Sequence, residues 1–231
     1  MMSLEERSRR FAEDAQTTLS AVLVGDFEIV SRRGEGSDRF IVQPRERHIP
    51  LFVDDAYLAD FAMTIYLDMD RSGTYLKAVG SALMLSSTLD RTPLLRLEYR
   101  ADMHSDPIAH WQFHAERGAF SHLLARAHTH RPGRVGKPHD LSSIHLPVGG
   151  ERFRPCLEDF LQLLVVDCGV DSKEGWETAI KDGRESWRRR QLGSAVRDVP
   201  SEAVRVLTEL GWSCSPPEGA VAENLVPLRA W

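Results

Sequence analysis

The N-terminal part of the chain shows two hydrophobic patterns in succession, the first helical and the second strand-like. Apolar residues first recur every three to four positions, which predicts a helix over residues 4–23. Ser3 is suited to cap this helix, because a serine hydroxyl accepts a hydrogen bond from the first turn. The apolar side of the helix is formed by Phe11, Ala15, Leu19, Val22 and Leu23.

Between residues 27 and 148, apolar and polar residues alternate in short runs, as in strands with one buried face. Glycine-containing turns separate several of these runs, so we expect hairpins and an antiparallel sheet. Pro44 and Pro50 are expected to interrupt regular structure after the second run. The expected strands cover residues 27–32, 39–42, 62–69, 75–85 and 94–100.

Residues 108–117 follow a proline that suits a helix start, but their alternation favours a strand. A helix would place Trp111 and Phe113 on different faces, whereas a strand places both in the core. Residues 143–148 repeat the alternation and place His145 on the polar side. The polar face of the 108–117 strand would carry His110, Gln112, His114 and Glu116.

After Gly149 the apolar spacing becomes helical again. One helix is expected to begin at Pro155, and a second covers approximately residues 175–192. Pro200 opens a third helix, for which proline is favourable at the first position. The residues of this third helix that are expected to face inward are Val204, Leu207 and Leu210.

Together these elements predict an α+β fold. It consists of an antiparallel sheet of about five to seven strands, with an N-terminal helix and a C-terminal helical group. The length of 231 residues suits a core domain with a helical appendage. We expect the core domain, with its histidine-rich strands, over residues 1–168. Residues 169–231 are then a C-terminal helical segment and tail packed on that core.

The composition narrows the class of protein. Hydrophobic residues make up 42% and charged residues 27%, which is typical of soluble globular proteins. A net charge of -5 argues against a surface that binds nucleic acid throughout, although it permits a local basic patch. The three cysteines are far apart, which argues against a disulfide framework and suits a reducing cytoplasm. No run approaches the roughly 18 apolar residues of a membrane span, so we expect a cytoplasmic protein with no membrane association.

Clustered histidines are the strongest functional signal. Eight of the nine lie between residues 104 and 145, and imidazole transfers protons near neutral pH. If the two histidine strands pair, His145 stands opposite His110 or His114. His114 and His145 would then serve as general base and general acid on a phosphodiester. In that hypothesis Glu116 orients one ring, and the phosphate is held by Arg152 and Arg154.

A metal site is the second use that these histidines suggest. His128 and His130 are two residues apart, so their rings can converge on one ion from an extended segment. Zinc or another divalent transition metal would be the ion, and otherwise no cofactor is implied. The expected ligands are His114, His128, His130 and His145.

Two runs of the chain are similar to an uncharacterised bacterial protein family. They are AHWQFHAER, beginning at Ala109, and HLPVGGERFRPCLED, beginning at His145. The resemblance implies a bacterial-type protein and carries no activity with it. Two histidine strands followed by a helix also resemble the small toxins of toxin–antitoxin pairs, over about fifty residues and without a diagnostic motif.

Three functions remain open from the sequence. The first is a non-enzymatic regulatory or protein-interaction protein with a histidine-rich polar face, because no P-loop, nucleophile elbow or H-E-x-x-H motif is present. The second is a metal-independent phosphodiesterase or ribonuclease, and the third is a histidine-ligated metal-binding protein. Another protein is the expected partner, and the basic residues that would contact RNA are Arg152, Arg154, Arg184 and Arg188.

Overall fold

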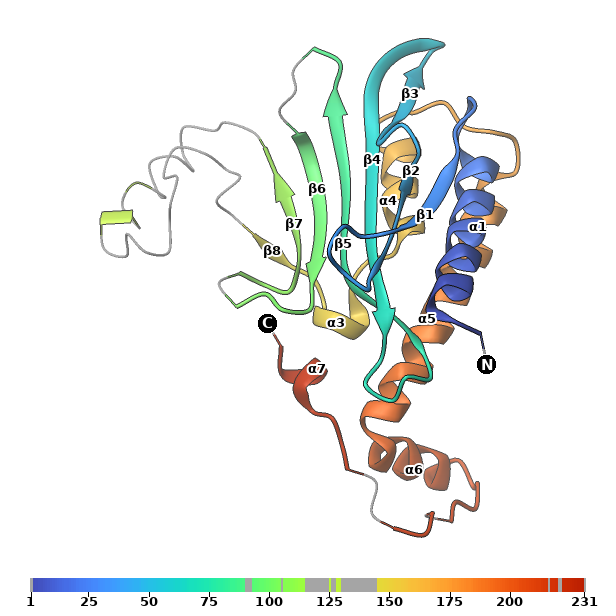
Figure 1. Cartoon of the computed structure of the whole chain (residues 1–231), viewed down its shortest axis with the longest axis vertical. Helices are drawn as coiled ribbons and strands as arrows, with labels where there is room; N and C mark the ends of the chain where they lie inside the picture. The colour runs from blue at the N-terminus through green and yellow to red at the C-terminus, as the bar shows by residue number, and fades with distance from the viewer. Residues whose placement is uncertain are drawn as a thin grey trace.

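The computed structural model has the predicted α+β fold, with an N-terminal helix, an antiparallel sheet and C-terminal helices (Figure 1). It describes residues 2–89, 93–104, 106–114, 125, 128–129, 145–215, 217–219 and 222–230. The strands are β1 (Ile29–Arg33), β2 (Phe40–Pro44), β3 (Ile49–Val53), β4 (Ala56–Met69), β5 (Leu76–Ser87), β6 (Pro93–Arg100), β7 (Ala109–Phe113) and β8 (Leu146–Pro147). The helices are α1 (Leu4–Val22), α3 (Gly150–Phe153), α4 (Leu157–Val166), α5 (Trp176–Asp198), α6 (Pro200–Glu209) and α7 (Val226–Arg229).

All the pairs of described strands are antiparallel, and the sheet runs in the order β1-β2-β4-β5-β6-β7-β8. The long strand β4 has two partners on the same edge, because β3 pairs with its first half and β2 with its second half. This order follows the chain closely, as expected for strands joined by hairpins.

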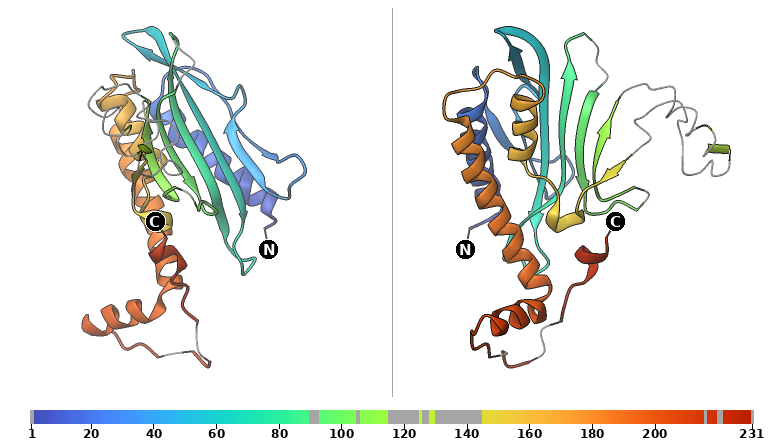
Figure 2. Two further views of the ribbon diagram at one scale, coloured as in Figure 1. Left: turned by 90° about the vertical axis from the view of Figure 1, so that its left-hand side faces the viewer. Right: turned by 180° about the vertical axis from the view of Figure 1, so that it is seen from behind.

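Helices α1, α4 and α5 cover one face of the sheet, as the view from behind shows (Figure 2). The core lies between these two layers and is formed by every second residue of the central strands. We call the opposite face of β4–β8, which Figure 1 turns to the viewer, the open face. The core residues of strands and helices include Phe61, Met63, Leu67, Leu83, Leu97, Leu19, Phe160, Leu164 and Ile180.

Helix α1 begins as the sequence predicted. The backbone N–H of Glu6 donates to Ser3 Oγ at 3.2 Å, and the Ser3 N–H donates back to Glu6 Oε2 at 2.7 Å. This reciprocal capping box satisfies two backbone donors that have no partner inside the helix. Leu19 and Val22 are fully buried at the other end, so the predicted apolar side packs on the sheet.

Eight strands of the sheet lie in the described residues, and the prediction missed one of them because of its proline. Pro50 lies inside β3, where it was expected to interrupt regular structure. β3 pairs only with β4 among the described strands, so it is an edge strand. Proline is tolerated on an edge, because its missing N–H removes no hydrogen bond from a second neighbour.

Strand β7 forms as predicted within the described residues, but its burial differs. Trp111 is partly buried and stacks on Phe160 of α4, with ring centroids 5.6 Å apart. Phe113 is 45% exposed, so the prediction that it lies in the core was wrong. His110, which was predicted on the polar face of the strand, is buried. β7 ends at Phe113, so the apolar residue at the end of the strand is the exposed one.

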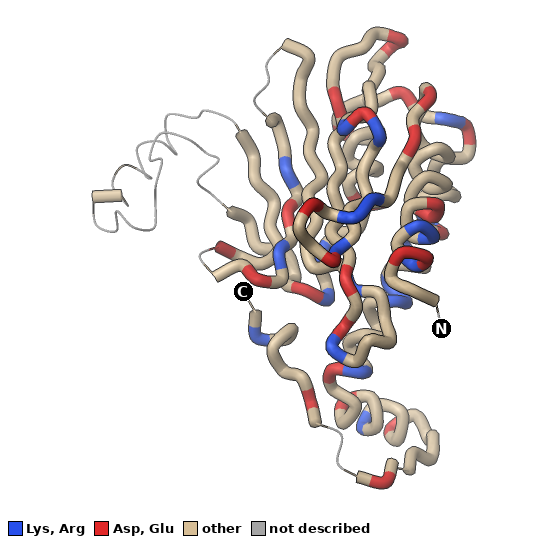
Figure 3. The backbone as a smooth tube through the Cα atoms, viewed as in Figure 1, with Lys and Arg blue, Asp and Glu red and all other residues tan. Residues whose placement is uncertain are grey.

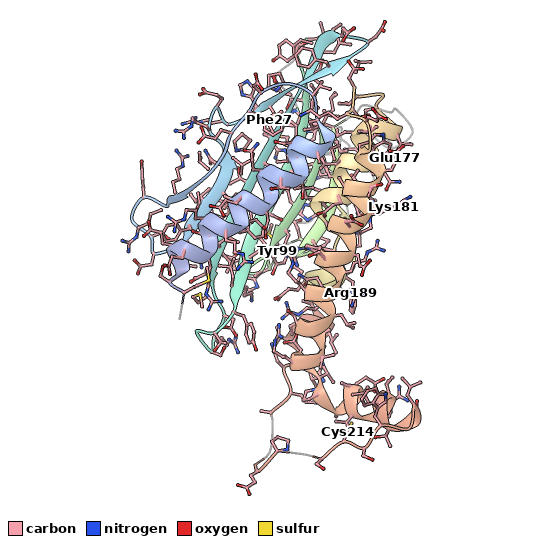
Figure 4. The ribbon with its side chains drawn as sticks, turned by 90° about the vertical axis from the view of Figure 1, so that its right-hand side faces the viewer. Phe27, Tyr99, Glu177, Lys181, Arg189 and Cys214 are labelled. Atoms are coloured by element: carbon pink, nitrogen blue, oxygen red, sulfur yellow. The ribbon has the colours of Figure 1, made fainter. Side chains whose placement is uncertain are left out.

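The C-terminal helices differ from the prediction at α6. Helix α5 continues to Asp198, and α6 extends from its end, beyond the rim of the sheet (Figures 1 and 2). No residue of α6 is buried, so the expected inward packing of its apolar side was wrong. On α5, the labelled residues Glu177, Lys181 and Arg189 follow the exposed side (Figure 4). Gly183 lies on the opposite side, where a Cβ atom would come within 2.5 Å of Glu158.

Candidate functional site

Strands β6, β7 and β8 bring polar side chains together on the open face. Glu98 of β6 lies opposite His110 of β7, and Arg96 lies opposite Gln112. On the other side of β7, the pairing of His110 with Pro147 brings His145 alongside Gln112 in an antiparallel register. We call this group the histidine site; its residues are Arg96, Glu98, Asp106, His110, Gln112 and His145.

His110 is the buried centre of the histidine site, with only 1% of its surface exposed. Its Nδ1 lies 2.8 Å from the carbonyl oxygen of Pro107, which can only accept, so Nδ1 carries the proton. The other ring nitrogen, Nε2, is 3.7 Å from Glu98 Oε2. Nε2 is buried and makes no hydrogen bond to any described residue. A buried polar atom of this kind is costly, because it has given up water without gaining a partner.

His145 lies next to this ring and is more accessible. The two imidazoles meet edge to face, with centroids 4.5 Å apart. His145 Nδ1 is 3.5 Å from Asp106 Oδ1, and its Nε2 is 3.5 Å from the side-chain nitrogen of Gln112. An amide nitrogen only donates, so this contact suits a lone pair on Nε2 and a proton on Nδ1.

The charge state of His145 follows from its surroundings. Burial lowers the pKa of His145 below its ordinary value, and neighbouring His110 lowers it further. Asp106 and Glu98 act in the opposite direction, but they do not reverse the shift. The imidazole is therefore mainly neutral at pH 7. Its unprotonated nitrogen is Nε2, which faces the Gln112 amide.

Arg96 supplies the positive charge of the histidine site. Its Nη1 is 3.6 Å from Glu98 Oε1, and about a third of the side chain (34%) is exposed. Its Nε is buried and donates to no described acceptor. Glu98 thus stands between the guanidinium of Arg96 and the ring of His110, and it contacts both.

The predicted pairing of the two histidine strands is confirmed, since β7 and β8 are hydrogen-bonded neighbours. The ring that packs against His145 is that of His110, one of the two partners expected from the sequence. His114 follows β7, and its backbone N–H donates to the Leu94 carbonyl at 3.0 Å. By strand alternation it extends the row of His110 and Gln112.

The other members of the predicted acid–base and metal sets are only partly described. Glu116 and His130 lie outside the described residues, so the proposed role of Glu116 beside His114 stays a prediction. His128 is described and partly buried. In the described part of the chain, no three His, Cys, Asp or Glu side chains are placed to hold a metal ion. The zinc set that includes His130 likewise stays a prediction.

Arg152 and Arg154 lie away from the histidine site. Arg152 donates to Asp198 at 2.5 Å and to Glu151 at 2.8 Å. Arg154 donates to the Glu151 carbonyl, and its guanidinium lies 3.9 Å from the centre of the Tyr99 ring. Tyr99 alternates with Glu98 along β6 and therefore faces the helix side of the sheet, where its ring is buried. Burial raises the pKa of Tyr99 to about 12.

The basic end of α5 is also occupied by contacts within the chain. Arg184 donates to Asp159 of α4 at 2.7 Å and to Gln162 at 2.5 Å. Arg188 lies 3.9 Å from the same Asp159 carboxylate, although 65% of its side chain is exposed. These pairs attach α5 to α4, which is the ordinary structural role of such arginines.

A second feature is the exposed apolar residues of α6. Its polar residues are joined to one another, since Arg205 donates to Glu202 at 2.5 Å and to Glu209 at 2.6 Å. The exposed apolar residues of α6 include Val204, Leu207 and Leu210, which fall on the other side of the helix. We call them, with their neighbours at the end of α5 and after α6, the α6 surface: Leu192, Val196, Val204, Val206, Leu207, Leu210 and Trp212.

Several residues of the histidine site were not singled out from the sequence. Alternation in the run 94–100 already placed Arg96 and Glu98 on the polar side of their strand. What could not be read was which histidine strand would lie beside them. Asp106 belongs to the loop before β7, and no spacing rule connects it with His145, which is 39 positions later in the chain.

No match was found when the chain was compared with models of known protein families, with curated proteins and with solved structures. The two features that bear on function are therefore the histidine site and the α6 surface. In the described part of the chain, no helix is both long and apolar enough to cross a membrane.

Proposed function

We propose that this chain is a protein-interaction protein that binds a partner protein through the α6 surface. The observation that carries the proposal is that an amphipathic helix of ten residues buries none of them. Monomeric proteins rarely expose contiguous apolar surface, and such surface commonly marks a site of protein–protein contact.

The position of α6 supports this function. The helix projects beyond the rim of the sheet, at the end of α5, where a second molecule can reach it (Figure 2). The charged residues Glu202, Arg205 and Glu209 form ion pairs with one another within the helix. A partner is therefore recognised by the apolar side, in the manner of a helix that lies in a hydrophobic groove.

The energetics favour a partner. An isolated helix of ten residues is marginal in water, because few hydrogen bonds offset the cost of starting it. Leu210 and Trp212 are 70% and 66% exposed, so both would gain from burial. Burying one leucine side chain contributes about 1.5 to 3 kcal/mol, and a groove that accepts several of these residues would exceed the cost of ordering them.

Site-specific photocrosslinking in the native cells tests the proposal. A benzophenone amino acid replaces Leu210, which lies in the α6 surface, or Lys181, which is exposed on α5 and lies far from it. We expect a discrete adduct with one protein from position 210 and none from position 181. Introducing Leu207→Asp beside the probe should remove the adduct while the melting temperature stays unchanged. Equal adducts from both positions, or an adduct that survives Leu207→Asp, would contradict the proposal.

A further inference from the structure

On the open face, one row of paired residues leads across the sheet to the histidine site, and we call this row the floor. The strand register places Thr64, Ala82, Glu98 and His110 in one row across β4 to β7. The first two are small, so an extended ligand can approach the sheet closely on that side. Three strand spacings of about 4.8 Å separate β4 from β7, which gives a length of about 14 Å.

Tyr66 stands at the β4 end of this floor. It pairs with Gly80 of β5, and a Cβ at Gly80 would lie 3.4 Å from its ring, so the aromatic ring lies over the glycine. Tyr66 is 41% exposed and is on the same face as Thr64, two residues before it. An exposed aromatic ring on a sheet is a platform on which a nucleobase can stack.

His145 supplies a base at the other end. Its Nδ1 faces Asp106, and its Nε2 is oriented as an acceptor by Gln112. A carboxylate that orients one ring nitrogen while the other takes a proton is the arrangement of a general base. The side chain of His145 is 22% exposed, so it is partly accessible to a substrate.

His110 and Glu98 hold this arrangement together. The ring of His110 is fixed by Pro107 and supports the edge-to-face contact with His145. Its buried Nε2 has no hydrogen bond in the described part of the chain and points toward Glu98. His110 and Glu98 are therefore positioning residues. The unsatisfied Nε2 of His110 indicates that a bound ligand completes the site.

Arg96 adds the group that binds an anion. Arg96 pairs with Gln112 across the strands, and Gln112 contacts His145. The Nε–H of Arg96 has no described acceptor. A guanidinium presents a fork of N–H donors that fits a phosphate or the negative charge that develops on it. A neutral base, a cation and an aromatic platform thus share one face.

We propose that the open face is a catalytic site that cleaves single-stranded RNA by transphosphorylation, with His145 as general base and Arg96 on the phosphate. The ribose 2′-hydroxyl replaces the Gln112 amide as the donor to His145 Nε2, which removes the hydroxyl proton, and that oxygen attacks the adjacent phosphorus. The O2′–P bond forms as the P–O5′ bond breaks. The departing O5′ takes a proton from water, and the resulting hydroxide recovers the proton from His145. The products are a 2′,3′-cyclic phosphate and a 5′-hydroxyl.

RNA is the phosphodiester that suits these residues. Its 2′-hydroxyl is a built-in nucleophile, so a base and a cation perform the step without a separate nucleophile. Single-stranded RNA is recognised largely by stacking of its bases on aromatic side chains, which suits the exposed ring of Tyr66. Lys and Arg residues are spread among acidic ones along the described backbone (Figure 3), and the net charge is -5. Contact with a few nucleotides fits that distribution better than wrapping a long polyanion.

Cleavage of a fluorescent single-stranded RNA by the full chain tests the proposal. We expect products that end in a 2′,3′-cyclic phosphate, no cleavage of DNA of the same sequence, and the same rate with chelator present. His145→Ala should lower the rate by about a hundredfold or more, as is typical for loss of a general base. Arg96→Ala should lower it by a similar factor, because it removes stabilisation of the phosphate charge.

The control is His48→Ala. His48 is an exposed histidine 3.8 Å from Asp60, so it matches the His145–Asp106 pair in kind but lies on the β3–β4 side of the sheet. Its rate should equal that of the parent. Tyr66→Ala should weaken the binding of a non-cleavable 2′-O-methyl RNA about fivefold or more, measured by fluorescence anisotropy. Melting curves establish that each variant is folded.

Intact RNA after incubation with the folded parent chain would overturn the proposal. It would also be overturned if folded His145→Ala cleaves like the parent, if DNA is cleaved equally, or if chelator abolishes the activity. None of these results bears on the α6 surface, because no residue of that surface lies in the sheet that forms the open face.

Discussion

Helices α1 and α6 are both amphipathic, yet the chain buries the apolar side of only one. α1 packs against β1, β2 and α5, and its residues Leu19 and Val22 have no exposed surface. α6 packs against the end of α5 and buries none of its residues. Helical spacing therefore identifies the apolar side of a helix, but it does not say whether the same chain covers that side. An apolar side that the fold leaves uncovered is a candidate for binding another molecule.

The same contrast recurs within β7. Trp111 and Phe113 alternate in the sequence and share one face of the strand, but only Trp111 reaches the helix layer, where it stacks on Phe160. The burial of a β7 side chain therefore depends on its contact with a helix residue such as Phe160, and not on the alternation alone. These differences are measurable as changes in the free energy of unfolding.

The largest expected difference is between two leucines on the two helices. Leu19→Ala on α1 should lower the free energy of unfolding by about 2 to 5 kcal/mol, because it removes a buried side chain and leaves a cavity. Leu207→Ala on α6 should change it by no more than about 0.5 kcal/mol, as expected at an exposed position. Urea unfolding of both variants measures the two values. A large loss from Leu207→Ala would mean that α6 is covered within the chain.

The second comparison uses the two aromatic residues of β7. Trp111→Ala should cost about 3 kcal/mol, at the lower end for large aromatic residues because the side chain is only partly buried. Phe113→Ala should cost less than about 1 kcal/mol, since its side chain is 45% exposed. The denaturant midpoints of the two variants, compared at the same dependence of the unfolding free energy on denaturant concentration, provide the test. Similar losses for both variants would show that the helix layer extends over Phe113.

The ends of the two helices provide a smaller effect. Ser3→Ala should cost about 1 kcal/mol, because it removes the side-chain half of the capping box of α1. At the start of α6, Val199 makes no side-chain cap, so Val199→Ser should leave stability equal or slightly higher. Thermal unfolding of the two variants measures both. A loss from Val199→Ser larger than that from Ser3→Ala would contradict this assignment of the caps.

The smallest effect concerns the pH dependence of stability. His145 faces His110, Asp106 and Glu98, and burial together with His110 lowers its pKa in the folded chain. As pH falls from 7 to 5, the unfolded chain binds this proton first, so acidification lowers the free energy of unfolding. His145→Gln lacks this contribution and should lose less stability over the same interval. Equal losses in the parent and the variant would show that the His145 environment does not disfavour the charged ring.

Local sequence determined much of the secondary structure. The capping box of α1 joins residues three apart, and the alternation in each central strand reflects a period of two that holds wherever one face is buried. Hairpin-linked runs were enough to predict an antiparallel sheet, because neighbouring runs pair with little loss of chain entropy. Pro50 shows the limit of such rules, since its strand is allowed only by its place on an edge.

Tertiary structure alone decided which side chains meet. His110 and His145 are 35 positions apart, and their contact requires the particular register in which β7 pairs with β8. A slip of one residue would turn His145 to the other face of the sheet. Arg154 was expected beside that ring, but the alternation of β6 and the turn after β8 carry it to Tyr99 on the helix side. Such neighbours depend on contacts between segments distant in sequence, whereas spacing records only the shape of each segment.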